Sequence, residues 1–83
     1  MDNVKLSEKQ KEVIRLMQNG YSIYNRPGGY VRVSKTLLSF QNIHINPSTL
    51  TALLNKLIVK RWKHLESDTV YVLTQFGKSL PLQ

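Results

Sequence analysis

The sequence predicts one small α+β domain that spans residues 1–83. Three observations lead to it: apolar residues recur at helical spacing in two segments, runs rich in Tyr, Val and Ile flank turn residues in two others, and 83 residues leave no room for a second domain. A chain of this length buries roughly 60% of its unfolded surface, so the core is thin. The absence of cysteine excludes disulfides and thiolate metal sites as supports for that core.

The first element is a helix over Glu8–Asn19. Ser7-Glu8-Lys9-Gln10 has the form of a capping box, in which the Ser and Gln side chains satisfy free backbone N–H groups. Val13, Ile14, Leu16 and Met17 then form an apolar stripe. The stripe stops at Asn19-Gly20, and glycine is the usual residue just past a helix end.

A β-hairpin is predicted next, pairing Tyr21–Asn25 with Tyr30–Ser34 across the turn residues Arg26-Pro27-Gly28-Gly29. The stretch Ser34–Ile45 has two interpretations. Ser34 can cap a short helix over Lys35–Phe40, or Phe40–Ile45 can alternate as a third strand. The pattern does not decide between them.

A second helix is predicted over residues 47–60. Pro47 suits the first helical position, and either Asn46 or Ser48 can cap it. Its core-facing stripe consists of Leu50, Leu53, Leu54, Leu57 and Ile58.

Two further strands, Lys60–Glu66 and Thr69–Thr74, are expected around the turn Glu66-Ser67-Asp68. Tyr71 and Leu73 face one way, Val70 and Val72 the other. Thr74–Lys78 reads as a cap and one helical turn, and Trp62 as a core plug beneath these strands.

Charge points to a partner class. The chain carries a net charge of +7, with twelve Lys and Arg against five Asp and Glu. No carboxylate lies between Val13 and Leu65, where eight of the basic residues fall. Such a segment attracts polyanions. The alternative is a basic surface that serves only solubility.

The second half resembles the winged helix-turn-helix family of prokaryotic DNA-binding proteins. Ile45–Leu50 is similar to the entry of a recognition helix, and Leu54, Leu57, Ile58 and Lys60-Arg61-Trp62 continue the likeness. Val70–Lys78 resembles the second wing strand and the Y-x-L-T-x-x-G-K run that closes such domains. The resemblance covers about residues 34–78 and implies a small winged-helix-like domain, here with an extra N-terminal β-hairpin.

In that family the recognition helix lies in the major groove of duplex DNA. Projection at 100° per residue places Ser48, Ala52, Asn55 and Val59 on the outward face. Small and hydrogen-bonding side chains suit contact with base edges, and flanking cations hold phosphates. The expected DNA-binding residues are Ser48, Thr49, Thr51, Ala52, Asn55, Lys56, Lys60, Arg61 and Lys63.

The function expected from these residues is binding of double-stranded DNA by a small transcriptional or mobile-element regulator. One helix gives weak recognition, so a homodimer or a protein partner is expected as well.

Two alternatives stay open. The first is a protein–protein interaction adaptor on the same scaffold, docking through the apolar hairpin or Val59; the acidic turn at residues 66–68 favours it. The second is single-stranded nucleic acid binding through Tyr21, Tyr24 and Tyr30, which are interleaved with Arg26 and Arg32.

Enzymatic chemistry is not expected. His44 and His64 are the only histidines, the chain has no cysteine, and no carboxylate lies between Val13 and Leu65, so nothing suggests a nucleophile, base and orienting acid. The same scarcity of ligands predicts no metal site and no cofactor. The sequence shows neither an apolar signal-peptide core nor a membrane-spanning run, so the expected location is cytoplasmic, without membrane contact.

Overall fold

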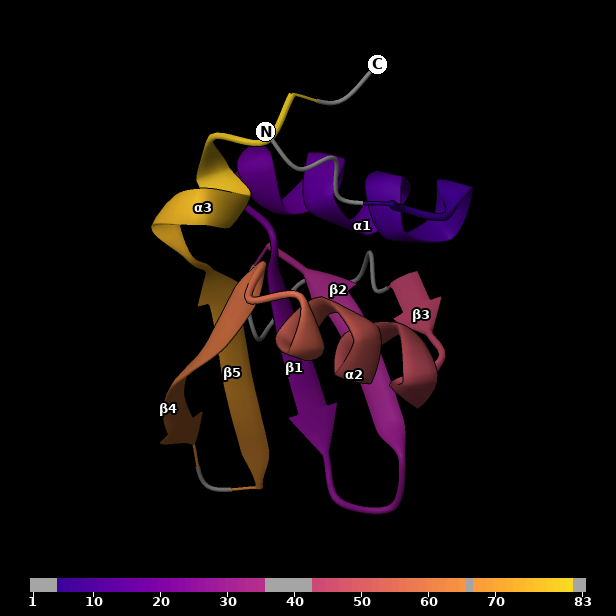
Figure 1. Ribbon diagram of the computed structural model, residues 1–83. Coiled ribbons are helices and arrows are strands. Elements are labelled where there is room, and N and C mark those ends of the chain that lie inside the picture. The colour runs from indigo at the N-terminus through magenta and orange to yellow at the C-terminus, as the bar shows by residue number, and fades with distance from the viewer. Residues whose placement is uncertain (1–4, 36–42, 66, 82–83) are drawn as a thin grey trace.

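The computed structural model describes residues 5–35, 43–65 and 67–81 (Figure 1). The described residues form three helices and a five-stranded antiparallel sheet, which confirms the α+β class. The order along the chain is α1 (Glu8–Gln18), β1 (Ser22–Arg26), β2 (Tyr30–Ser34), β3 (Ile43–Ile45), α2 (Pro47–Asn55), β4 (Val59–Leu65), β5 (Asp68–Leu73) and α3 (Gln75–Lys78). The strands lie in the order β3-β2-β1-β5-β4, so β3 and β4 are the sheet edges.

The core lies between the helices and one face of the sheet. Figure 1 shows α1 across one end of the sheet and α2 in front of it. Directly paired residues share a face of a sheet. The pairs Val33–Ile23 and Ile23–Tyr71 therefore define the helix-facing side. The buried apolar cluster joins this side to α1 and α2; its members are Val13, Ile14, Met17, Ile23, Val31, Val33, Ile45, Leu50, Leu53, Ile58, Val59 and Leu73.

The first helix and the hairpin are confirmed within a residue of their predicted bounds. At the start of α1 the Gln10 N–H donates to Ser7 Oγ at 3.1 Å, and the Ser7 N–H donates to Gln10 Oε1 at 3.2 Å, which completes the capping box. The hairpin pairs β1 with β2 from Ser22–Ser34 to Arg26–Tyr30. Its turn passes through Gly28 and Gly29, both at positive φ, a conformation that glycine adopts without strain.

The stretch Ser34–Ile45, for which the sequence allows a helix or a strand, is described mainly at its C-terminal end. Residues 43–45 form β3, which pairs with β2 and extends the hairpin to three strands. This agrees with the strand interpretation at these three positions. The rest of that strand and nearly all of the alternative helix over Lys35–Phe40 lie outside the described residues.

The predicted end of the second helix is wrong. α2 ends at Asn55, and Leu57 adopts a left-handed φ of 61° with 71% of its surface exposed, rather than facing the core. The reversal at Leu57 lets Val59 pair with Leu73 in the sheet, where Val59 is 2% exposed instead of facing outward. A left-handed non-glycine residue costs about 1–3 kcal/mol. Burying Ile58 and Val59 offsets this cost at about 1.5–3 kcal/mol for each side chain.

The start of α2 differs from the prediction in its cap, whereas the last two strands and α3 agree with it. Asn46 takes the N-cap position of α2, but its side chain makes no capping hydrogen bond. β4 and β5 confirm the two predicted strands, and Tyr71 and Leu73 share the face opposite to that of Val70. Thr74 caps α3 by accepting a hydrogen bond from the Gly77 N–H at 3.0 Å, as predicted.

Candidate nucleic-acid interface

The exposed side of α2 is uncharged. Ser48, Thr51 and Asn55 are exposed, whereas Thr49 and Ala52 are half-buried. Thr51 Oγ1 donates to the Pro47 carbonyl at 3.1 Å, one turn back along the helix. The helix contains no acidic or basic residue in its first and last turns. The exposed side of α2 therefore presents small polar groups, and the nearest basic residues in the sequence come after the helix, at Lys56 and on β4.

Lys56 does not extend the outward face of α2. Its Nζ donates to the Lys5 carbonyl at 2.6 Å and to Gln10 Oε1 at 2.8 Å. Gln10 lies in the first turn of α1 and Lys5 in the segment just before it, so this ammonium ties the end of α2 to the start of α1. The structure separates Lys56 from the other predicted phosphate contacts.

The other three predicted cations lie on the strand that the sequence predicts after the second helix. Lys60, Arg61 and Lys63 belong to β4, where every residue from Lys60 to His64 is exposed. Arg61 pairs with Tyr71 and lies on the helix-facing side of the sheet. Lys60 pairs with Val72 and Lys63 with Val70, on the opposite side. The edge strand thus carries positive charge on both of its faces.

Trp62 is not the predicted core plug. It lies where the β4–β5 register shifts between Arg61 and Lys63, and 57% of its surface is exposed. The Lys63 Nζ lies 4.3 Å from the centroid of its ring, a cation–π contact. The sequence held a signal for this exposure. The residues two positions away, Lys60 and His64, are polar, so alternation assigns Trp62 to a solvated face.

The predicted acidic turn at residues 66–68 does not expose the charge of Asp68. The Asp68 side chain is only 3% exposed and pairs with two guanidinium groups, Arg32 at 2.7 Å and Arg26 at 3.1 Å. Burial alone would raise the pKa of this carboxyl. The hydrogen bonds and charges of Arg32 and Arg26 outweigh that effect and hold the pKa below its usual value of 3.8. Asp68 is therefore a neutralised structural group and not a charge that repels phosphate; Glu66 lies outside the described residues.

Ion pairing leaves a surplus of cations. The described carboxylates Glu8, Glu12 and Asp68 each pair with Lys or Arg. Within residues 5–35, 43–65 and 67–81, the basic side chains without such a carboxylate are Lys5, Arg15, Lys35, Lys56, Lys60, Arg61, Lys63 and Lys78. Three of these follow one another closely on β4, which makes that strand the densest region of unpaired positive charge.

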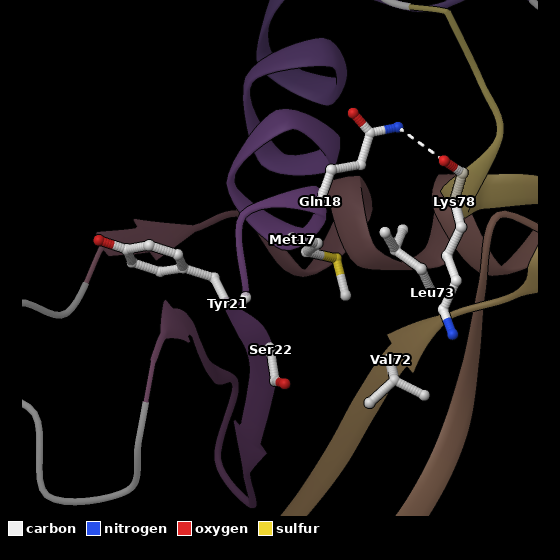
Figure 2. A pocket seen from close by; sticks show the side chains of 8 residues that line it. Met17, Gln18, Tyr21, Ser22, Val72, Leu73 and Lys78 are labelled. Carbon is white, nitrogen blue, oxygen red and sulfur yellow. Dashed lines mark hydrogen bonds between the residues drawn. The ribbon is translucent and has the colours of Figure 1, made fainter.

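A pocket lies between the C-terminal end of α1 and the β1 and β5 strands (Figure 2). Met17, Tyr21, Val72 and Leu73 give it apolar walls. Gln18 Nε2 donates hydrogen bonds to the Gly77 carbonyl at 3.2 Å and to the Leu80 carbonyl at 3.1 Å. These bonds join α1 to the C-terminal segment. None of the predicted DNA-binding residues lines this pocket.

The two histidines are far apart in the sheet. His44 is exposed on β3 and His64 on β4, the opposite edge strands, and His64 Nδ1 lies 3.0 Å from Thr69 Oγ1. Among the described residues, no group of three or more His, Cys, Asp or Glu side chains is arranged to hold a metal ion. None of the helices in this part of the chain combines the length and apolar character needed to cross a bilayer.

Comparisons of the chain with protein-family models, curated proteins and solved structures found no match.

Proposed function

We propose that the protein binds double-stranded DNA, with α2 in the major groove and the β4–β5 hairpin against the phosphate backbone. The observation that carries the proposal is the exposed basic run of β4, Lys60 to His64, which follows a short helix, α2, whose exposed side is polar. The proposal keeps the winged-helix-like arrangement that the sequence resemblance implies, with the β1–β2 hairpin as the N-terminal addition.

The composition of α2 supports its place in the groove. Nine residues give a helix about 14 Å long, enough to contact a few base pairs. Ser48, Thr51 and Asn55 are exposed, and their hydroxyl and amide groups suit hydrogen bonds to base edges. The half-buried Ala52 and Thr49 allow close approach without adding bulk. Asn55 is the side chain best suited to pair with adenine through two hydrogen bonds.

The chemistry of β4 supports the backbone contacts. Lys60, Arg61 and Lys63 have no carboxylate partner within the described chain, so their charges are available to phosphates. Phosphate contacts fix the position of a protein on DNA, whereas base contacts specify the sequence. The proposal therefore divides the work: β4 holds the duplex and α2 reads it.

A regulatory role follows as part of the same proposal. A single short helix reads too few base pairs to select one genomic site, so a small transcriptional or mobile-element regulator of this size acts with a second copy or a protein partner. A protein–protein adaptor is the second candidate. Val59 is buried and cannot dock a partner, but the exposed Leu57 offers an apolar contact in its place.

Neutralising the basic strand tests the proposal. Lys60→Gln, Arg61→Gln and Lys63→Gln combined are expected to weaken duplex binding about 10- to 100-fold at low salt, because three phosphate contacts are lost. Fluorescence anisotropy of a labelled duplex measures this change. The matched control replaces Lys5, Arg15 and Lys35 by Gln and removes the same charge elsewhere. Equal losses in both variants would show that net charge alone, and not β4, attracts DNA.

A further inference from the structure

Trp62 is the one tryptophan of the chain, and it lies on the surface of an edge strand. More than half of the residue stays exposed although the Lys63 ammonium lies over its ring. Burying a large aromatic ring is favourable, and this thin core leaves the largest ring outside. The side chain is thus placed for contact with something other than the protein's own interior.

The neighbours of Trp62 indicate the chemistry of that contact. Exposed cations flank it on both sides, Arg61 before it and Lys63 after it, and Lys60 is two residues away. An exposed aromatic ring among cations is the arrangement by which proteins stack an unpaired base and hold the adjoining phosphates. Within a paired duplex both faces of each internal base are covered by its neighbours, whereas an unpaired base beside the duplex can turn a free face toward the ring.

We propose that Trp62 and Lys63 form a stacking site for an unpaired base, which makes DNA with a single-stranded segment beside a duplex the preferred ligand. The inference rests on the proposed function, because the same β4 cations hold the phosphates on either side of the stacked base. Trp62 supplies the stacking surface. Lys63 holds one side of the ring and lies within reach of the adjoining phosphate.

The Tyr-rich hairpin is a weaker place for such a site. Tyr24 is 7% exposed and lies beneath the Arg32 guanidinium at 5.3 Å, and Tyr21 packs against the core. Tyr30 is exposed, but the neighbouring Arg26 and Arg32 both form ion pairs with Asp68. The hairpin therefore offers one free ring and no comparable pair of unpaired cations.

The test compares a blunt DNA duplex with the same duplex extended by a short single-stranded overhang. The overhang is expected to bind more tightly and to quench the fluorescence of Trp62, which reports on this site alone because the chain has no other tryptophan. Trp62→Ala is expected to weaken overhang binding about 5- to 150-fold, the range for one stacked base, and to change blunt-duplex binding less than about twofold. Trp62→Phe should restore most of the difference.

Tyr30→Ala is the control, since it removes an equally exposed ring at the hairpin. A loss of overhang binding with Tyr30→Ala but not with Trp62→Ala would overturn the proposal. Equal affinity for blunt and overhang DNA, with unchanged fluorescence, would overturn it too while leaving duplex binding intact. Overhang binding that depends on Trp62 without any blunt-duplex binding would instead refute the proposed function and keep the stacking site. Absence of binding to either DNA would refute both.

Discussion

Asp68→Asn is expected to destabilise the fold by about 3 kcal/mol, a large part of the stability of a domain this small. Asn keeps the shape of the side chain but removes the charge. The Arg32 guanidinium, largely buried and 2.7 Å from the carboxylate, would then lack its counter-ion. Removing one member of a buried ion pair is costly because the remaining charge stays desolvated. Urea denaturation at neutral pH measures the loss.

Glu12→Gln is the matched control for Asp68→Asn. Glu12 pairs with Lys9 on the exposed side of α1 at 3.3 Å, and exposed pairs of this kind contribute within about 1 kcal/mol. If Asp68→Asn unfolds at the same urea concentration as Glu12→Gln, the paired carboxylate does not stabilise the sheet.

The pH dependence of the same pair has a definite sign. The pKa of Asp68 is lowered in the folded state, so its stabilising contribution is present above the unfolded pKa near 3.8 and is lost as pH falls through the lower folded value. The difference in stability between the parent protein and Asp68→Asn should therefore shrink in acid. A difference that stays constant down to strongly acidic pH would contradict this assignment.

Gly77→Ala is expected to destabilise the protein by about 3 kcal/mol, against the preference of helices for alanine. A Cβ at Gly77 would overlap the Ile58 carbonyl oxygen and crowd the Leu73 side chain at 3.0 Å. That carbonyl accepts hydrogen bonds from the Thr74 N–H at 2.9 Å and Thr74 Oγ1 at 3.1 Å. A shift of α3 would break them. Overpacking and lost hydrogen bonds cost more than the roughly 1 kcal/mol gained in helix propensity.

Thermal unfolding measures the effect of Gly77→Ala, with Gln75→Ala as the control on the exposed side of α3. Only the Gly77 variant should lower the melting temperature strongly. If both variants melt together with the parent protein, α3 adjusts without loss and its close contact with Ile58 is not required.

Elements set by local chemistry could be predicted from the sequence. The Ser7–Gln10 capping box, the Gly28-Gly29 turn and the Thr74 cap each act over a few residues, and all three are present. Pro47 marked the start of α2 for the same reason. Positions where tertiary contacts outweigh local preference could not be predicted. Val59 fits the helical projection, but its burial against Leu73 in the sheet decides its place.

The sequence identifies the exposed cations of the candidate site, but it does not show which distant residues pair with the charged groups around them. Lys60, Arg61 and Lys63 are exposed on the predicted strand, but the helix before them ends early, at Asn55, and the chain reverses at Leu57. The bond from Lys56 to Gln10 joins residues far apart in the sequence, and no periodicity reveals it. The same holds for Asp68, whose partners Arg26 and Arg32 lie on the distant hairpin. Long-range pairing of this kind changes which charges remain for a ligand.

The salt dependence of duplex binding tests the central claim, that the unpaired cations of β4 hold the DNA backbone. Anisotropy of a labelled random-sequence duplex, titrated at several salt concentrations, gives the slope of log K against log salt. Each contacted phosphate contributes about −0.9, so contacts from Lys60, Arg61 and Lys63 predict a slope of about −3 or steeper. No binding at low salt, or a slope near zero, would contradict the claim and favour the protein–protein adaptor.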